Sequence, residues 1–76
     1  MNYLDGQKVL LGDIVDLGNG TSGVVVAVID QGDYASGFSE EEWNYLGQGA
    51  LLETSEFGLL HYSNAGHDFT LIRRPH

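Results

Sequence analysis

The sequence predicts a mainly β domain: a small five-stranded antiparallel barrel with one short α-helix inserted between strands 2 and 3. Eleven glycines in 76 residues separate short stretches rich in Val, Ile, Leu and Tyr, which is typical of strands joined by tight turns. Only one segment, near the middle of the chain, carries helix signals. A chain of this length forms one domain, residues 1–76, and its core must be small and continuous.

The first two strands are predicted as a hairpin over residues 12–30. In the first strand, Val15 and Leu17 face one side, and Ile14 and Asp16 face the other. A loop follows, and its Gly and Asn residues tolerate positive φ. The second strand begins at a glycine and is apolar on both faces and rich in β-branched side chains. We therefore expect it to be the central and most buried strand.

A helix of about two turns is predicted for residues 40–46. Ser39 and Glu42 form a predicted capping box, in which the Ser39 hydroxyl accepts from the Glu42 amide and the Glu42 carboxylate accepts from the Ser39 amide. Phe38 and Trp43 occupy the two positions of a hydrophobic staple. Three glutamates complement the helix dipole in the first turn, and the glycine after the last turn suits the C-terminal cap. So short a helix is unstable alone, and we expect its apolar residues, Trp43 and Leu46, to pack on the sheet.

Three further strands are predicted at residues 49–54, 58–62 and 69–73, with turns at residues 55–58 and 63–66. Their apolar residues alternate with residues that face the other side. Five short strands of this kind can close into a barrel that side chains fill without a lumen.

The chain is strongly acidic. It has 11 Asp plus Glu against 3 Lys plus Arg, a net charge of -8. Arg73 and Arg74 lie at the C-terminal end, so residues 1–72 carry 11 acids against Lys8 alone, a net charge of -10. Such a surface repels phosphate backbones and anionic lipid, which argues against direct binding to nucleic acid or membranes. It either keeps a small protein soluble or attracts a basic partner. Without cysteine, signal segment or membrane span, the sequence predicts a soluble protein of a reducing compartment.

The sequence offers little for catalysis, a cofactor or a metal. His61, His67 and Asp68 are the only grouping that invites such an interpretation, and their spacing fits no zinc pattern. A strand histidine that is exposed or bonded to the backbone explains His61 better. The serines lie in turns or caps, and the glycine-rich loop lacks the lysine and the strand-to-helix context of a phosphate site. We therefore expect neither an enzyme nor a cofactor.

The remaining constellation is acidic and aromatic. The candidate partner-binding residues are Asp30, Asp33, Tyr34, Glu40, Glu41, Trp43 and Tyr45. Aromatic anchors ringed by carboxylates suit a binder of a basic protein, since the rings fill pockets and the charges speed encounter. The alternative is structural. Helix docking explains Trp43 better than an interface does, and a solvated loop and helix face would account for the others.

Two resemblances extend this interpretation. Residues 9–17, with Gly12-Asp13, followed by Gly23-Val24-Val25-Val26, resemble the opening hairpin of SH3-like barrels, which implies an SH3-like fold. Over most of the chain the sequence is similar to a group of small bacterial proteins, some of which look like the immunity proteins encoded beside secreted toxins. That likeness is carried by Asp5-Gly6, Gly12-Asp13, Gly23-Val24-Val25, Ile29-Asp30, Tyr34, Glu42-Trp43, Tyr45-Leu46, Gly49, Gly58-Leu59 and His61-Tyr62.

The resemblance and the charge together lead to one hypothesis and two alternatives. We expect a cytoplasmic bacterial immunity protein, a monomer or weak dimer, that occludes the basic active-site cleft of a cognate toxin with residues 30–45. A phage or plasmid DNA mimic is one alternative, although its acids should lie in rows over one face. The other is a constitutive SH3-like adaptor that docks a peptide in an exposed aromatic groove.

Overall fold

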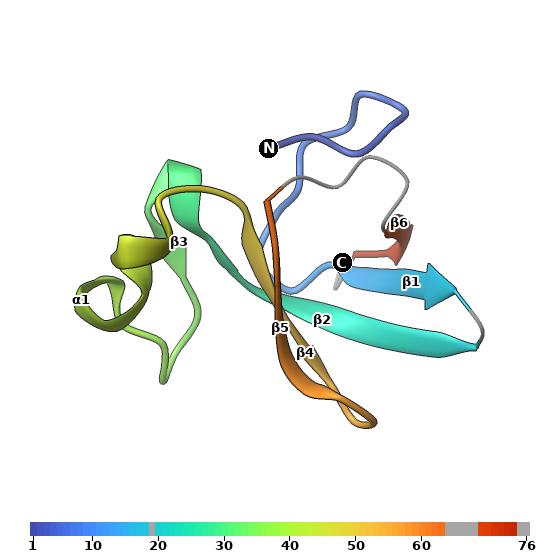
Figure 1. Cartoon of the computed structure of the whole chain (residues 1–76). Coiled ribbons are helices and arrows are strands. Elements are labelled where there is room, and N and C mark those ends of the chain that lie inside the picture. The colour runs from blue at the N-terminus through green and yellow to red at the C-terminus, as the bar shows by residue number, and fades with distance from the viewer. Residues whose placement is uncertain (19, 64–68, 75–76) are drawn as a thin grey trace.

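The computed structural model describes residues 1–18, 20–63 and 69–74. Within them the chain forms six antiparallel strands in one sheet (Figure 1): β1 (Ile14–Gly18), β2 (Thr21–Val28), β3 (Asp33–Tyr34), β4 (Ala50–Thr54), β5 (Gly58–Tyr62) and β6 (Thr70–Arg73). Three short helical segments lie between β2 and β4. They are the 3-10 turn η1 (Ile29–Gln31), the α-helix α1 (Glu40–Trp43) and the 3-10 turn η2 (Asn44–Leu46).

The sheet has the order β5-β4-β2-β1-β6, and β3 pairs with the end of β2. The predicted closed barrel of five strands is therefore wrong: β3 is an additional strand, and in the described part of the chain β5 and β6 do not pair. Aromatic side chains take the place of that pairing. The ring of Phe69, next to β6, lies 5.4 Å from that of Tyr62 in β5 and 5.9 Å from that of Tyr3. Because the N-terminal segment supplies Tyr3 and Val9 to the core, the core is covered without backbone closure.

The central position of β2 is confirmed, since β1 and β4 pair with it on either side. Its register with β4 slips between Val25 and Ala27. Such a bulge inserts an extra residue and bends the strand. Val25 and Val28 enter the main core, whereas Val26 and Ala27 belong to a second apolar cluster. This strand therefore contributes to two cores.

The second cluster is covered by an arm, which we define as residues 29–49. Phe38, Trp43 and Leu46 of the arm pack against it, which confirms that the helical segment docks on the sheet. The helical span also agrees with the prediction, although its second half is the 3-10 turn η2. Figure 1 shows the arm projecting from one end of β2 and β4, away from the β1–β2 hairpin.

The N-terminal cap of α1 forms half of the predicted capping box. The Ser39 hydroxyl accepts from the Glu42 amide at 3.3 Å. The Glu42 carboxylate, however, accepts from that same hydroxyl at 3.1 Å instead of from the Ser39 amide. One serine oxygen thus serves both bonds.

Strands β1, β4, β5 and β6 lie where predicted, within a residue at their ends, whereas β2 begins at Thr21 instead of Gly23 and ends at Val28 instead of Asp30. The β1–β2 loop is shorter than expected, because Thr21 and Ser22 pair with Gly18 and Asp16 of β1. Most of the predicted turn at residues 63–66 lies outside the described residues. No helix in the described ranges has the length and apolar character needed to cross a membrane.

Candidate functional site

Asp30, at the base of the arm, has a structural role. Its carboxylate accepts from the Gly49 amide at 2.9 Å and from the Met1 amino group at 3.1 Å. Partial burial opposes ionisation, but these hydrogen bonds outweigh it and hold the pKa of Asp30 below its ordinary value. The Ile29 amide also donates to the Gly49 carbonyl at 2.8 Å. The two ends of the arm are thereby tied together.

Tyr34, in β3, and Glu40, in α1, lie near each other in the arm. Tyr34 pairs with Ala27 and packs on the second cluster. Its hydroxyl is buried and has no hydrogen-bond partner within the described residues. Burial, and secondly the charge of Glu40, raise the pKa of Tyr34. The Glu40 carboxylate also lies beside the turn at Gly32, so the start of α1 lies close to the turn before β3.

Trp43 and Tyr45 separate into two roles. Trp43 is half-buried against the second cluster, which favours the structural interpretation of this residue. Tyr45 is 74% exposed, a larger fraction than that of any other large apolar or aromatic side chain in the described ranges. Asp33 and Glu41 are exposed as well, and the Asp33 carboxylate accepts from the side-chain amide of Gln31 at 3.2 Å.

We call Asp33, Glu40, Glu41 and Tyr45 the arm surface. The arm holds five acids and no Lys or Arg. Between side chains or termini that the structure describes, the ion pairs are Met1 with Asp30 and Arg74 with Asp13. The carboxylates of the arm surface therefore have no cationic partner there. The adjacent carboxylates repel one another, whereas the positive end of the α1 dipole attracts them. A cationic ligand would relieve the repulsion.

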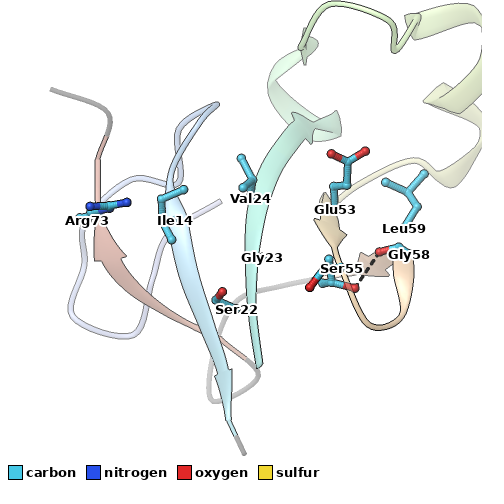
Figure 2. Close-up of a pocket in the computed structure, with 10 residues that line it drawn as sticks. Ile14, Ser22, Gly23, Val24, Glu53, Ser55, Gly58, Leu59 and Arg73 are labelled. Carbon is cyan, nitrogen blue, oxygen red and sulfur yellow. Dashed lines mark hydrogen bonds between the residues drawn. The ribbon is translucent and has the colours of Figure 1, made fainter. Parts of the chain in front are cut away.

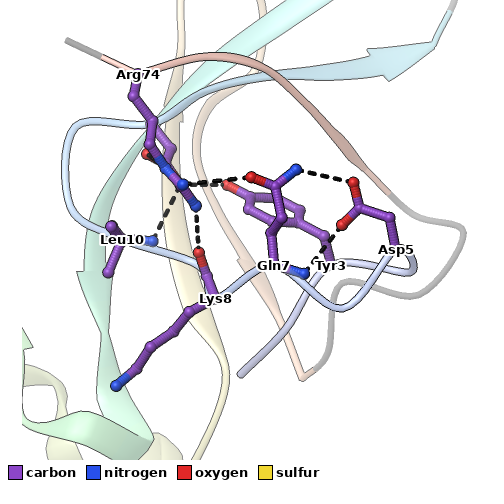
Figure 3. Close-up of polar contacts among 7 residues, drawn as sticks. Tyr3, Asp5, Gln7, Lys8, Leu10 and Arg74 are labelled. Atoms are coloured by element: carbon purple, nitrogen blue, oxygen red, sulfur yellow. Dashed lines mark hydrogen bonds and ion pairs between the residues drawn. The ribbon is translucent and has the colours of Figure 1, made fainter. Parts of the chain in front are cut away.

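A buried polar cluster joins the two ends of the chain (Figure 3). Asp13 is fully buried, and its carboxylate accepts from the Tyr3 hydroxyl at 2.7 Å, the Leu10 amide at 3.0 Å and Arg74 Nε at 3.2 Å. Arg74 also donates to the Lys8 carbonyl at 2.6 Å. Burial, followed by the bond to Asp13, raises the pKa of Tyr3. Sequence reasoning missed this cluster, because nothing local relates Asp13 to a residue 61 positions away.

The structure also contains a groove that the sequence did not predict. It has a volume of about 610 Å³ and crosses the outer face of the sheet, the face opposite the main core (Figure 2). Ile14, Val24 and Leu59 supply its apolar lining, and Glu53 and Arg73 supply charges. The arm packs on the neighbouring part of this face, and the residues that line the groove all lie outside the arm.

His61 lies on β5 and contacts the backbone, as expected from the sequence. His61 is exposed, and its Nε2 lies 2.8 Å from the Gln48 carbonyl oxygen. His67 and Asp68 lie outside the described residues. Within the described ranges no group of three or more His, Asp or Glu side chains is placed to hold a metal ion.

Comparison with known proteins gives no relative: no protein-family model, no curated protein and no solved structure matches this chain.

Proposed function

We propose that this protein is an immunity-type inhibitor that binds the basic cleft of a cognate secreted toxin through the arm surface. The observation that carries the proposal is the arm surface itself. Asp33, Glu40, Glu41 and Tyr45 are all exposed on a segment that contains no Lys or Arg. Inhibition would be steric and electrostatic, with no bond made or broken.

The way in which the arm is held supports tight binding. Three apolar side chains dock it on the second cluster, and Asp30 and Gly49 tie its two ends together. A surface that is already ordered loses little conformational entropy on binding. Tyr45 offers a large amphipathic anchor, and the three exposed carboxylates of the arm surface would steer a cationic partner during encounter.

We also propose that the domain is SH3-like in topology, although its sheet is not closed. Apart from the two-residue β3, the strands run in the order β6-β1-β2-β4-β5. This is an antiparallel meander of four strands with the last strand returned beside the first. That order supports kinship with SH3-like domains, as the hairpin at residues 9–26 suggests.

Co-expression with the product of the neighbouring toxin gene tests the inhibitor proposal. The wild-type protein should restore growth, and Glu40→Lys/Glu41→Lys should lose protection because both charges of the arm surface are reversed. Glu56→Lys is the matched control, since this exposed acid lies in the β4–β5 turn, away from α1 (Figure 1).

Each outcome of that test is informative. Failure of the wild-type protein to protect removes the proposal, and would favour the DNA-mimic or adaptor alternatives. Full protection by the doubly substituted arm would place the interface elsewhere on the molecule.

A further inference from the structure

The pairing register places five residues in one row straight across the outer face of the sheet (Figure 2). Pairs run from β6 through β1, β2 and β4 to β5, and the row reads Arg73, Ile14, Val24, Glu53 and Leu59. The three aliphatic side chains are half-buried, and the two charged ones are exposed. None of the five belongs to the main core, and only Leu59 packs against the second cluster.

The charges of this row are arranged symmetrically. Neighbouring strands lie about 4.8 Å apart, so Arg73 and Glu53 each lie about 7 Å from the midpoint between Ile14 and Val24. Neither has an ion-pair partner in the part of the chain that the structure describes. The row thus presents a cation, two aliphatic side chains and an anion at equal steps.

We propose that this face binds a second copy of the chain. A twofold axis lying in the interface, parallel to the strands and above the midpoint between β1 and β2, places Arg73 of each copy over Glu53 of the other. The same rotation places Ile14 of each copy over Val24 of the other. Every contact occurs twice, as in any isologous interface.

The geometry of the two sheets agrees with such a pair. Rotation about an axis parallel to the strands keeps the strand directions of the two copies aligned, which is one of the two ways in which sheets pack face to face, about 10 Å apart. The aliphatic side chains of each copy would then fill the open groove of the other. In the adjacent row the rotation brings Asp16 of one copy over Ser22 of the other, an acceptor over a hydroxyl.

Charge complementarity selects a second copy over an unrelated partner. Self-association requires that this face carry opposite charges at equal distances from one midpoint. Binding of an unrelated protein would require neither feature. The apolar contact is small, so the dimer belongs to the weak, concentration-dependent class that buries less than about 1,200 Å². The proposal is independent of the toxin, because no residue of the row belongs to the arm surface.

Sedimentation equilibrium over a concentration series tests the proposal. The wild-type mass should rise from 8.3 kDa toward twice that value. Arg73→Glu and Glu53→Arg should each raise the dimer dissociation constant at least about tenfold, because each substitution acts twice across the axis. The double variant Arg73→Glu/Glu53→Arg restores both pairs and should recover dimerisation. Glu41→Arg, a matched charge reversal on the arm surface, should leave the constant unchanged.

A wild-type mass that stays at 8.3 kDa up to millimolar protein would overturn the proposal. A charge-swapped double variant that does not recover dimerisation, although its melting temperature equals that of the wild type, would overturn it as well. Amide spectra recorded on dilution give a second readout. The largest changes in amide chemical shift should occur at and around Ile14 and Val24. Shifts confined to β5 or β6 would mean pairing of edge strands, and would equally contradict a face-to-face dimer.

Discussion

Replacement of Arg74 by alanine should remove a large share of the stability of this domain. The guanidinium pairs with the fully buried carboxylate of Asp13 through an Nε to Oδ1 distance of 3.2 Å and donates to the Lys8 carbonyl at 2.6 Å. In Arg74→Ala that carboxylate keeps only the Tyr3 hydroxyl and the Leu10 amide as donors. A buried charge then remains without a counter-ion, and the N-terminal segment loses its hydrogen bonds to Arg74, although the contact between the rings of Tyr3 and Phe69 remains.

The size of the effect follows from burial. Removal of one partner from a buried ion pair costs about 3–5 kcal/mol. The Arg74 side chain is 29% exposed and the carboxylate retains two donors, so we expect about 2–4 kcal/mol. A domain of 76 residues has a free energy of unfolding of about 4–11 kcal/mol. The melting temperature should therefore fall by about 10–25 °C.

Thermal and urea unfolding, followed by circular dichroism, measure this effect. Arg73→Ala is the matched control, since it removes the same side chain one position earlier, where it is exposed and forms no ion pair with another described residue. Its stability should lie within about 0.5 kcal/mol of the wild type. Asp13→Asn/Arg74→Ala should be less destabilised than the sum of the single variants, because the two groups are coupled. An Arg74→Ala shift no larger than that of Arg73→Ala would refute the reasoning.

Three further predictions concern the arm. Gly49→Ala should lower the free energy of unfolding by at least about 3 kcal/mol, and the control Gly47→Ala by about 1 kcal/mol. Both glycines have positive φ, but only at position 49 would a Cβ collide with the Tyr62 carbonyl. Equal urea midpoints for the two variants would contradict this. Asp30→Asn should be less stable than wild type at neutral pH, and the stabilities of the two proteins should converge below about pH 4. A carboxyl whose pKa falls on folding stabilises the folded state above its unfolded pKa of 3.8, and this stabilisation is lost as the pH drops through its folded pKa. Parallel pH profiles would contradict it. Ser39→Ala removes the cap acceptor and should cost about 1 kcal/mol in urea unfolding; an unchanged midpoint would mean that packing alone stabilises α1.

Local patterns predicted the helical segment at residues 40–46 and the positions of β1, β4, β5 and β6, because their causes lie within a few residues, but they missed η1 and β3. The hydroxyl of Ser39, the apolar side chains of Phe38 and Trp43 and the β-branched run of β2 act on their own neighbourhood. Barrel closure was predicted wrongly because it depends on whether two distant strands reach each other. Here Tyr62 and Phe69 meet through their rings instead.

The exposure of the candidate residues could be predicted in part for the same reason. The exposed acids and Tyr45 follow from the polar face of one short helix and its flanks. The hydrogen bonds of Asp30 to Gly49 and the row across the outer face depend on register between elements. A slip of one residue would turn every side chain of a strand to the other face, so sequence alone does not place Arg73 and Glu53 on one surface.

The central proposal, that the acidic arm surface binds a basic toxin cleft, is tested most directly by the binding kinetics of the purified protein with the toxin encoded beside it. The association rate should fall steeply with added salt, and Glu40→Lys/Glu41→Lys should lower it at least about tenfold. Glu56→Lys should change it less than about twofold, because this acid lies outside the arm. Absence of binding by the wild-type protein, or unchanged kinetics in the doubly substituted arm, would contradict the proposal.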